Sequence, residues 1–306
     1  MIQRRTLLGA AGAGAVVPTS LDPFRTLEWR DPARGRAIPV LIRPPRTDGK
    51  APLVLLSHGL GGSRDGLAYL GRALAEAGFI AVHLQHHGSD SAIWRGQSDP
   101  RAGMAAAVLD PGAAFARLGD VAFALDYLLA EREPGLRIDA DRVAIAGHSY
   151  GAWTASHMVG ERLPLAGFGP RLPDPRLRAA VMLSPIPPIG VPAAQAYREI
   201  AVPTLHVTGT RDYGYGVADW QARTVGYRNA AAPACLAVLE GANHAAFAGE
   251  EEIGGHWNNP TYQGRTAGLA TAFLLAVLRG DSAAKSALLT GAGLAKGDGF
   301  ESKGFG

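Results

Sequence analysis

The chain has 306 residues, of which 47% are hydrophobic and 19% charged, so it is able to bury roughly three quarters of its unfolded surface and is not a disordered chain. Its formal net charge is only +3, and no basic run with interleaved aromatic residues occurs, which argues against a nucleic-acid partner. The single cysteine, Cys235, excludes an internal disulfide. The composition indicates a globular protein whose fold does not depend on oxidation.

The N-terminus reads MIQRRTLLGAAGAGAVV, in which Arg4 and Arg5 precede an uncharged run of small and apolar residues. The run is too short for a transmembrane helix, which needs about 20 apolar residues. Its order of basic, apolar and small residues is typical of a secretory signal, and the paired arginines resemble a twin-arginine signal. We therefore expect residues 1–20 to direct export to the periplasm or medium, with no stable membrane insertion afterwards; the alternative is a frayed N-terminus of a cytoplasmic protein.

From residue 24 onward, short apolar runs alternate with longer helical patterns. This alternation predicts an α/β fold, with a mostly parallel central sheet and helices on both faces. We expect one domain over residues 21–280, and a loosely ordered tail over residues 281–306 because six of the last sixteen residues are glycine. Strands are expected at 38–43, 53–57, 79–84, 143–146, 179–183, 204–208 and 236–239, and helices at 66–77, 113–133, 150–159 and 265–279.

The expected strand 143–146 runs directly into the sequence Gly-His-Ser-Tyr-Gly and then into a helical pattern. A G-x-S-x-G turn between a strand and a helix is the setting in which an α/β fold exposes a nucleophilic serine. Ser149 is therefore the candidate nucleophile. A serine hydroxyl needs a histidine base, and the histidine needs a carboxylate that orients it.

Both partners are predicted from the strand ends downstream of Ser149. Asp212 follows the expected strand 204–208, and His244 follows the expected strand 236–239. The order serine, acid, histidine is the one found on this architecture, and all three residues leave the sheet at the same edge. Asp212 and His244 are thus the candidate acid and base.

Other residues of the same types are weaker candidates. Asp219 lies in the same loop as Asp212, and Asp174 precedes an expected strand instead of following one. His256 follows no strand. Among the remaining histidines, His148 adjoins the nucleophile and is expected to be packed or hydrogen-bonded. His83 and His206 lie within expected strands and are expected in the core. His86, His87 and Asp90 could suggest a metal site, but the side chains of two adjacent histidines point apart on a strand, so a metal is not expected.

The expected strand 53–57 is followed by His-Gly-Leu-Gly-Gly at 58–62. A glycine-rich turn at this place supplies one of the two backbone donors that stabilise an oxyanion, and the residue after the nucleophile supplies the other. The backbone amides of Leu60 and Tyr150 are therefore the expected oxyanion hole.

Several aromatic residues fall near these motifs. Trp153 lies one helical turn after Ser149, and Trp94 lies in the long segment after the expected strand 79–84. Tyr213, Tyr215 and Trp220 follow the candidate acid. We expect Trp153, Trp94 and Tyr213 to contribute to a substrate pocket.

Residues 36–280 resemble the α/β-hydrolase superfamily. The segments HGLGGSRDGLAYLGRALAEAGF, FIAVHL, QHHGSD and GHSYGAWTA resemble the bacterial group related to dienelactone hydrolases and platelet-activating factor acetylhydrolases. This resemblance implies a cofactor-free serine esterase or lipase. Two departures matter, because dienelactone hydrolases usually carry a cysteine where this chain has Ser149, and cutinases and polyester hydrolases typically have methionine where it has Tyr150.

The sequence therefore predicts hydrolysis of a neutral or apolar carboxylic ester, such as a lipid, through an acyl-enzyme, with neither a cofactor nor a metal. A histidine base of ordinary pKa predicts activity that rises between about pH 6 and pH 8. A cutinase-like polyester hydrolase, an amidase or a peptidase would use the same three residues. The alternative of another class is a noncatalytic binding protein that retains the fold.

Overall fold

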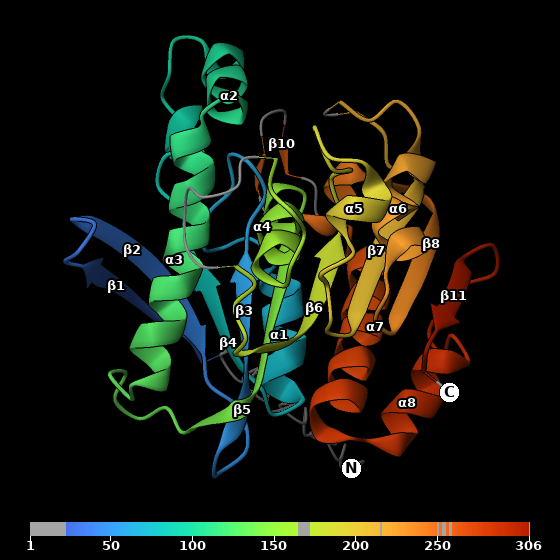
Figure 1. Cartoon of the computed structure of the whole chain (residues 1–306). Helices are drawn as coiled ribbons and strands as arrows, with labels where there is room; N and C mark the ends of the chain where they lie inside the picture. Colours follow the sequence, from blue (N-terminus) through green and yellow to red (C-terminus); the bar gives the residue numbers. More distant parts are fainter. Residues whose placement is uncertain are drawn as a thin grey trace, which may run out of the picture.

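The computed structural model describes residues 23–164, 172–214, 216–249, 251–252, 255–256 and 259–305. Within these residues, nine strands form one sheet in the order β1-β2-β4-β3-β5-β6-β7-β8-β11 (Figure 1), and β9 pairs with β10 in a small separate ribbon. The strands are β1 (Arg25–Asp31), β2 (Arg36–Arg43), β3 (Ala51–Ser57), β4 (Ile80–Leu84), β5 (Ile138–His148), β6 (Leu177–Leu183), β7 (Thr204–Arg211), β8 (Ala234–Asn243), β9 (Glu251–Glu252), β10 (Gly255–His256) and β11 (Gly299–Lys303).

Six neighbouring strands, from β4 to β8, are parallel to one another, and β1, β2 and β11 are antiparallel additions at the two edges. Parallel strands need crossover connections, which helices supply. The predicted fold class is confirmed, and so are all seven expected strands and all four expected helices. The helices are α1 (Ala68–Glu76), α2 (Pro100–Val108), α3 (Pro111–Leu129), α4 (Tyr150–Met158), α5 (Ala193–Ala196), α6 (Val225–Asn229), α7 (Pro260–Arg279) and α8 (Ser282–Leu289), with the 3₁₀ turns η1 (Ser91–Ile93), η2 (Trp220–Thr224) and η3 (His244–Phe247).

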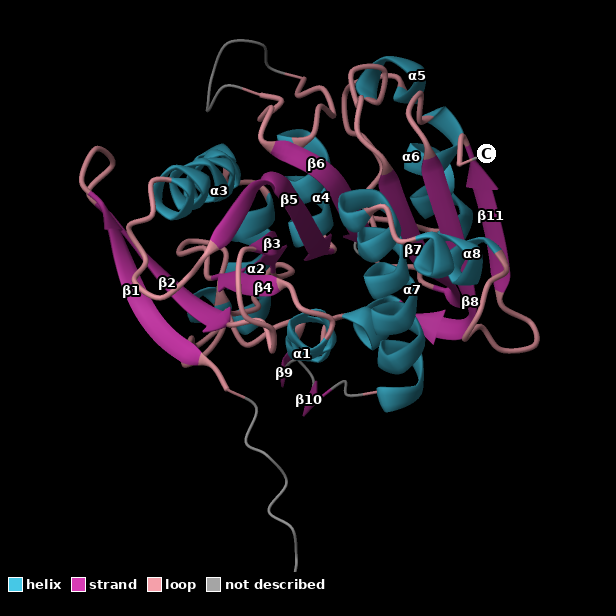
Figure 2. Cartoon of the chain, turned by 90° about the horizontal axis from the view of Figure 1, so that it is seen from below, coloured by secondary structure: helices cyan, strands magenta, loops and turns pink. Residues whose placement is uncertain are grey.

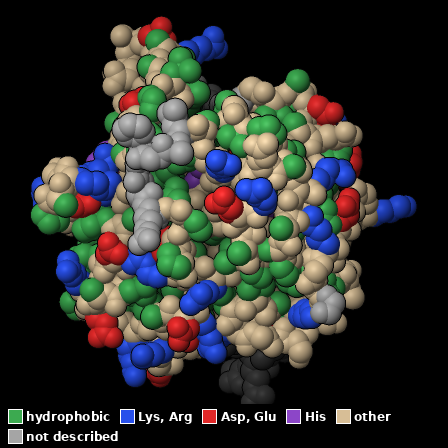
Figure 3. Space-filling model, viewed as in Figure 1, with side chains coloured by type: hydrophobic (Ala, Val, Ile, Leu, Met, Phe, Trp, Pro, Cys, Tyr) green, Lys and Arg blue, Asp and Glu red, His purple; other side chains and the backbone are tan. Residues whose placement is uncertain are grey.

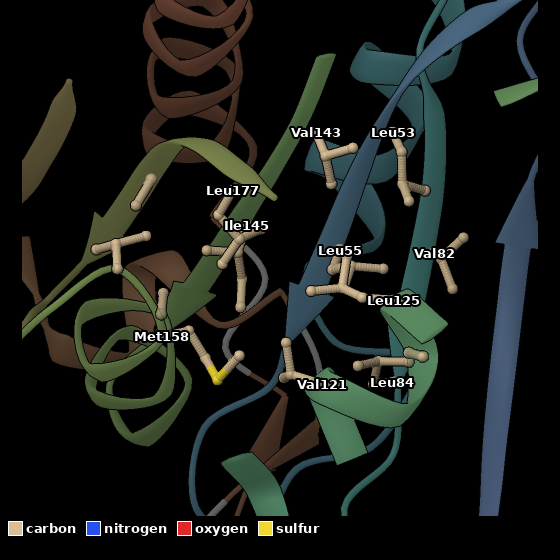
Figure 4. Close-up of a cluster of buried hydrophobic side chains, with 14 of the residues drawn as sticks. Leu53, Leu55, Val82, Leu84, Val121, Leu125, Val143, Ile145, Met158 and Leu177 are labelled. Carbon is tan, nitrogen blue, oxygen red and sulfur yellow. The ribbon is translucent and has the colours of Figure 1, made fainter. Parts of the chain in front are cut away.

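Each face of the sheet carries its own hydrophobic core. Along β3, Leu53 and Leu55 pack with α3 and α4, while Val54 and Leu56 pack with α1 and α7 on the other face. Figure 2 shows these two pairs of helices on opposite sides of the sheet. Successive side chains of a strand point to opposite faces, so a strand covered on both sides is apolar throughout. Figure 4 shows part of the first core, which includes Leu53, Leu55, Val82, Leu84, Val121, Leu125, Val143, Ile145, Met158 and Leu177.

The helix that covers β3 and β5 is α3, and its first residues carry a clear helix-start signal. The side chain of Asp110 accepts a hydrogen bond from the amide of Gly112, and Pro111 occupies the first turn of α3. An acidic cap followed by proline is a strong helix start, because it satisfies amides that have no partner inside the helix. The buried residues of α3 recur at helical spacing and include Leu118, Val121, Leu125 and Leu128.

The C-terminal segment differs from its prediction. We expect a loosely ordered tail from residue 281, but the structure forms α8 and then β11, which pairs antiparallel with the edge strand β8. Phe300 packs against the second core, and Asp298 binds Arg265 at 2.9 Å. Edge pairing uses backbone groups and needs no apolar periodicity, and Gly291, Gly293 and Gly297 have positive φ angles at the connecting turns. These glycines therefore allow tight turns in an ordered segment.

Two further expectations concern membranes and export. The expected signal at residues 1–20 lies outside the described residues. Within the part of the chain that the structure describes, no helix combines the length and the hydropathy needed to cross a bilayer.

Candidate active site

Three strands of the parallel sheet end at one place and bring the predicted residues together. Ser149 follows β5, Asp212 follows β7 and His244 follows β8. The Ser149 Oγ lies 2.9 Å from His244 Nε2, and His244 Nδ1 lies 2.9 Å from Asp212 Oδ1. Asp212 is completely buried, whereas Ser149 and His244 keep 8% and 6% of their surface exposed. A hydrogen-bonded serine, histidine and aspartate therefore open to solvent only at the serine end.

The backbone at Ser149 is strained, with φ 53° and ψ −113°. The left-handed region is costly for a residue with a Cβ atom, and such strain is characteristic of functional turns. The flanking glycines allow the turn, because a Cβ at Gly147 would strike the carbonyl of Gly151, and a Cβ at Gly151 would strike the carbonyl of Ser57. The two glycines let β3, β5 and the start of α4 approach closely enough to present the Ser149 hydroxyl.

The Asp212 carboxylate is held by residues that the sequence analysis did not identify. Thr208 donates to Asp212 Oδ2 at 2.8 Å, and the Ser184 hydroxyl donates to the same oxygen. The buried guanidinium of Arg223 lies 2.7 Å from Asp212 Oδ1 and donates to the Asp212 carbonyl. Although burial raises the pKa of Asp212, hydrogen bonding from His244 and the charge of Arg223 hold it below its usual value. Asp212 is therefore ionised at neutral pH.

Ser184 directly follows β6, so the rule that strand ends carry the site could have found it. Arg223 lies in η2, and no sequence signal marks it, because its partner is eleven residues away through an irregular loop.

His244 is kept neutral and correctly oriented. Burial lowers its pKa below the ordinary value, although the neighbouring Asp212 carboxylate raises it. The Asp212 carboxylate accepts from Nδ1, so Nε2 faces the Ser149 hydroxyl as an acceptor. His148 donates from Nε2 to the His244 carbonyl at 3.0 Å. The prediction that His148 is a hydrogen-bonded structural residue is confirmed.

The rival candidates lie elsewhere. Asp219 is exposed and accepts from the amide of Gln221 as the cap of η2. Asp174 binds Arg176 at 2.7 Å. His256 lies in β10, and among the described residues the histidine that contacts Ser149 is His244.

The glycine-rich turn after β3 lies beside the start of α4. The amide of Gly62 donates to the Gly59 carbonyl at 3.2 Å, which closes a turn over Leu60 and Gly61. Gly61 has φ +75°, and its carbonyl accepts from Trp94 Nε1 at 2.6 Å. Tyr150 is the first residue of α4, where backbone amides have no partner inside the helix. Both predicted oxyanion donors thus belong to segments that meet at the nucleophile.

A buried polar network underlies this turn and was not predicted. His86 Nδ1 donates to Asp120 Oδ2 at 3.1 Å, and Ser57 Oγ donates to His86 Nε2 at 3.0 Å. Ser57, His86 and Asp120 repeat the residue types of the site, but all three are completely buried, so they have no access to a substrate. Within the described residues, no group of three or more histidines, cysteines or acidic residues is arranged to hold a metal ion.

The aromatic residues are not gathered in one wall. The Trp153 ring lies between those of Tyr150 and His157, with centroid distances of 5.3 and 4.2 Å. Trp94 supports the turn at Gly61, and Tyr213 is 58% exposed beside the acid. Trp220 begins η2, and the expectation for Tyr215 lies outside the described residues. Of the three residues expected to line a substrate pocket, Trp153 lines a cavity, which is described below.

The parallel sheet, the strained serine turn and the strand-end histidine and aspartate are the features of the α/β-hydrolase fold. The predicted resemblance is confirmed by the comparisons with known proteins. The profile of a family described as platelet-activating factor acetylhydrolase, isoform II, matches residues 39–105, which include the turn at 58–62. Two proteins of Thermobifida alba, cutinase est1 and cutinase est2, are each 27% identical to this chain over 170 residues. The match covers 55% of this chain and 45% and 44% of the two cutinases, so the chain spans less than half of their length.

Proposed function

We propose that the protein is a serine hydrolase that cleaves carboxylic esters through an acyl-enzyme. The observation that carries the proposal is the hydrogen-bonded chain from Ser149 through His244 to Asp212, with 2.9 Å at each step. The similarity to an acetylhydrolase family and to two cutinases supports ester hydrolysis. A noncatalytic binding protein would not need a strained serine in contact with a buried histidine and aspartate.

The mechanism follows from the order of the hydrogen bonds between Ser149, His244 and Asp212. His244 Nε2 accepts the proton of Ser149 as its oxygen attacks the ester carbonyl, and Asp212 stabilises the imidazolium that forms. The amides of Leu60 and Tyr150 stabilise the negative oxygen of the tetrahedral intermediate. The His244 imidazolium then protonates the leaving alcohol. In the second half, His244 takes a proton from water, the hydroxide attacks the acyl carbonyl, and Ser149 leaves with the returned proton.

Labelling and turnover test the proposal directly. A fluorophosphonate probe is expected to modify the folded protein at Ser149, and p-nitrophenyl esters are expected to be hydrolysed faster than aminoacyl anilides. Peptide mapping identifies the modified residue. Absence of labelling at Ser149 in folded protein would contradict the hydrolase proposal, and faster anilide cleavage would favour an amidase or peptidase.

A second candidate function is hydrolysis of an aliphatic polyester. The observation that favours it is the pair of cutinase relatives. Tyr150 stands where cutinases typically have methionine, so the polyester is the second candidate and not the first. Clearing of a polycaprolactone suspension at a rate comparable with p-nitrophenyl butyrate hydrolysis would favour the polyester, and clearing no faster than in enzyme-free buffer would exclude it.

The pH dependence of kcat/KM is expected to follow the neutral fraction of His244. Neutral imidazole is the active base, so activity rises with pH and then levels off. Because burial lowers the pKa of His244, the midpoint of the rise in kcat/KM is expected below about pH 6.5. This is a lower pH than the rise between about pH 6 and pH 8 that an ordinary histidine predicts. Initial rates in a pH-stat measure the midpoint. Asp212→Asn should move the midpoint further down, because Asp212 raises this pKa; a midpoint above that of free histidine would refute the assignment.

The geometry of the turn after β3 predicts different outcomes for two adjacent substitutions. A Cβ at Gly61 would lie 2.8 Å from Met104 Sδ and 2.9 Å from the Trp94 ring, in addition to the positive φ. Gly61→Ala is therefore expected to displace the Leu60 amide and lower kcat by about 10²-fold, the usual effect of losing one oxyanion donor. Leu60→Ala keeps the amide and should change kcat little. Equal effects of the two substitutions on p-nitrophenyl acetate turnover would argue against an oxyanion role.

We also propose that the protein is exported through the twin-arginine route. The support is the order of Arg4, Arg5 and the following small and apolar residues. Fusion of residues 1–24 to a reporter that is active only after export should give signal, and Arg4→Lys with Arg5→Lys should abolish it. A fusion that stays in the cytoplasm with both arginines intact would overturn this proposal.

A further inference from the structure

A cavity of about 410 Å³ lies against α4, within the size range of small-molecule sites. Trp153 and Phe115 form part of its wall, and Leu109 and Ile189 lie at its margin. The other lining residues come from the connection between α2 and α3, from the end of α4 and from the segment that follows it: Val108, Asp110, Pro111, Ala114, His157, Glu161, Arg162, Leu163 and Pro164.

The margin of this cavity is unusually apolar for a protein surface. Among the described residues, five large hydrophobic side chains are exposed, and three of them border the cavity: Val108 at 61%, Leu109 at 80% and Ile189 at 77%. Figure 3 shows hydrophobic side chains at the upper end of the molecule, over α2 and the adjoining end of α3. A concentration of exposed apolar side chains around a hollow marks a binding site for apolar material.

The cavity lies close to the nucleophile. The amide of Trp153 donates to the Ser149 carbonyl at 3.0 Å, and four residues of helix rise about 6 Å. The Tyr150 ring contacts Trp153, which lines the cavity. Trp153, in the wall of the cavity, therefore lies one helical turn from the nucleophile along α4.

The inner end of the cavity is polar but uncharged at neutral pH. His157 and Glu161 are 2% and 4% exposed, and their side chains lie 3.9 Å apart. Burial lowers the pKa of His157 to about 4 and raises the pKa of Glu161 to about 8. A neutral imidazole and a protonated carboxyl thus form the buried polar part of the lining, and the charged lining residues, Asp110 and Arg162, are exposed.

We infer that this cavity binds the uncharged hydrocarbon chain of the ester substrate, an acyl or alkyl chain of medium length. The inference rests on the proposed function and specifies its substrate. Short esters such as acetates would react without using the cavity, and esters with longer chains would gain about 0.8 kcal/mol for each methylene that the apolar wall buries.

Exposed residues allow a test that does not disturb the core. In the double variant Leu109→Asp, Ile189→Asp, the ratio of kcat/KM for p-nitrophenyl octanoate to that for the acetate is expected to fall about tenfold or more, which corresponds to two lost methylene contacts. Phe24→Asp changes an equally apolar exposed residue (53%) away from the cavity, and should leave the ratio unchanged. An unchanged ratio in the double variant would overturn the inference.

Binding without turnover separates this inference from the proposed function. 1-Decanol added to Ser149→Ala should change the tryptophan fluorescence of the protein through Trp153, Trp153→Phe should remove that change, and the double variant should weaken the binding. If the wild-type protein hydrolyses no ester but binds decanol in this way, the proposed function fails and the cavity stands. If esters are hydrolysed but decanol binding does not depend on Leu109 and Ile189, the function stands and the cavity assignment fails.

A second inference comes from Arg117, an α3 residue whose side chain is completely buried. Its guanidinium donates to Ser57 Oγ at 3.0 Å and to the His58 carbonyl. It also donates to Thr154 Oγ1 on α4 at 3.0 Å, and it lies 4.6 Å from the centre of the Tyr150 ring. One side chain therefore contacts both segments that carry the expected oxyanion donors.

We infer that Arg117 is a positioning residue that holds the turn after β3 against the start of α4, so that the Leu60 and Tyr150 amides point to one oxygen. This inference rests on the proposed function, and it assigns Arg117 no contact with the substrate. Ser57, which accepts from Arg117, donates to His86, and His86 donates to Asp120 on α3. This network links the end of β3 to α3 and to the loop after β4. The oxyanion geometry is thus set by charge-assisted hydrogen bonds beneath the turn.

The Arg117→Met variant tests this role. Its kcat on p-nitrophenyl acetate is expected to fall about 10²-fold with little change in KM, and inhibition by a trifluoromethyl ketone, which forms an oxyanion at Ser149, should weaken in parallel. Arg117→Lys should recover part of both. The matched control is Arg265→Met, since Arg265 is likewise a hydrogen-bonded arginine, paired with Asp298, and lies 5.2 Å from a tyrosine ring, but it stands on α7 and, among the described residues, bonds to neither segment that carries an oxyanion donor.

A milder change covers the case in which Arg117→Met does not fold. Ser57→Ala removes one partner of the guanidinium and should lower kcat and ketone affinity together by a smaller factor. Unchanged kcat in folded Arg117→Met, or in folded Ser57→Ala, would overturn the inference. A rise in KM at constant kcat would do so as well, because it would indicate substrate contact. If the wild-type protein hydrolyses no ester, the proposed function fails first, and unaltered ketone binding would then reject the positioning role separately.

Discussion

Replacing Ser149 by alanine is expected to lower kcat on p-nitrophenyl acetate by on the order of 10⁶. The Oγ atom of Ser149 is the atom expected to form the acyl bond, and it lies 2.9 Å from the base that takes its proton. What remains is activation by binding and by the backbone amides, which is worth about 10³ to 10⁴ over water in enzymes with this arrangement. Alanine also keeps a Cβ, so the strain at φ 53° is unchanged.

Stability should therefore not explain the loss. The melting temperature of Ser149→Ala is expected to stay close to that of the wild type, because a nearly buried hydroxyl is removed and no cavity of consequence forms. Ser156→Ala, at a buried serine on the same helix, is the matched control and should retain activity. If Ser149→Ala kept more than about one part in 10³ of kcat, another residue would be the nucleophile.

Replacing Asp212 by asparagine is expected to lower kcat by about 10⁴ with little change in KM. Asparagine can keep the hydrogen-bonding pattern, but it cannot stabilise the imidazolium, and it can present an N–H to His244 that selects the wrong tautomer. Asp212 also neutralises Arg223, which is completely buried and 2.7 Å away. Loss of one partner of a buried ion pair costs about 3–5 kcal/mol of folding free energy, so this variant should also unfold at lower urea concentration.

The neighbouring Asp219 provides the control for Asp212. It is exposed and caps η2, and asparagine is as good a cap as aspartate. Asp219→Asn should therefore change neither kcat nor the urea midpoint. The reverse pattern, with activity lost in Asp219→Asn and kept within tenfold in Asp212→Asn, would move the acid to position 219. Urea titration beside initial rates at saturating ester separates the catalytic effect from the folding effect.

Much of this architecture can be predicted from the sequence because it depends on patterns of a few neighbouring residues. Val143 to Ala146 is apolar without alternation, which predicts a strand covered on both faces, and Gly147 and Gly151 bracket a serine between that strand and a helix. Strand β1 was missed because charged residues alternate with Leu27 and Trp29, as expected of an edge. The C-terminal strand was missed because Gly299 to Lys303 joins the sheet through backbone pairing with β8.

The residues that support the site could not be predicted from local sequence patterns. Arg223 and Arg117 are both completely buried, although arginine is usually exposed, and neither lies near a recognisable motif. Arg117 meets Ser57 across 60 residues of chain. Whether a buried charge is tolerated depends on acceptors that come from other elements, and those are known only after the sheet and helices have packed.

The sequence alone determined seven strands of the sheet and the helices α1, α3, α4 and α7 in their chain order, the turn at Ser149, and the strand ends that carry Asp212 and His244, because side-chain periodicity and turn chemistry act over a few residues. Only the tertiary structure decided how the carboxylate is held, how the turn at Gly61 is supported, and that Trp153 faces a cavity with an apolar margin. Those features arise from contacts between elements far apart in the chain, and their geometry is set by packing that no single segment encodes.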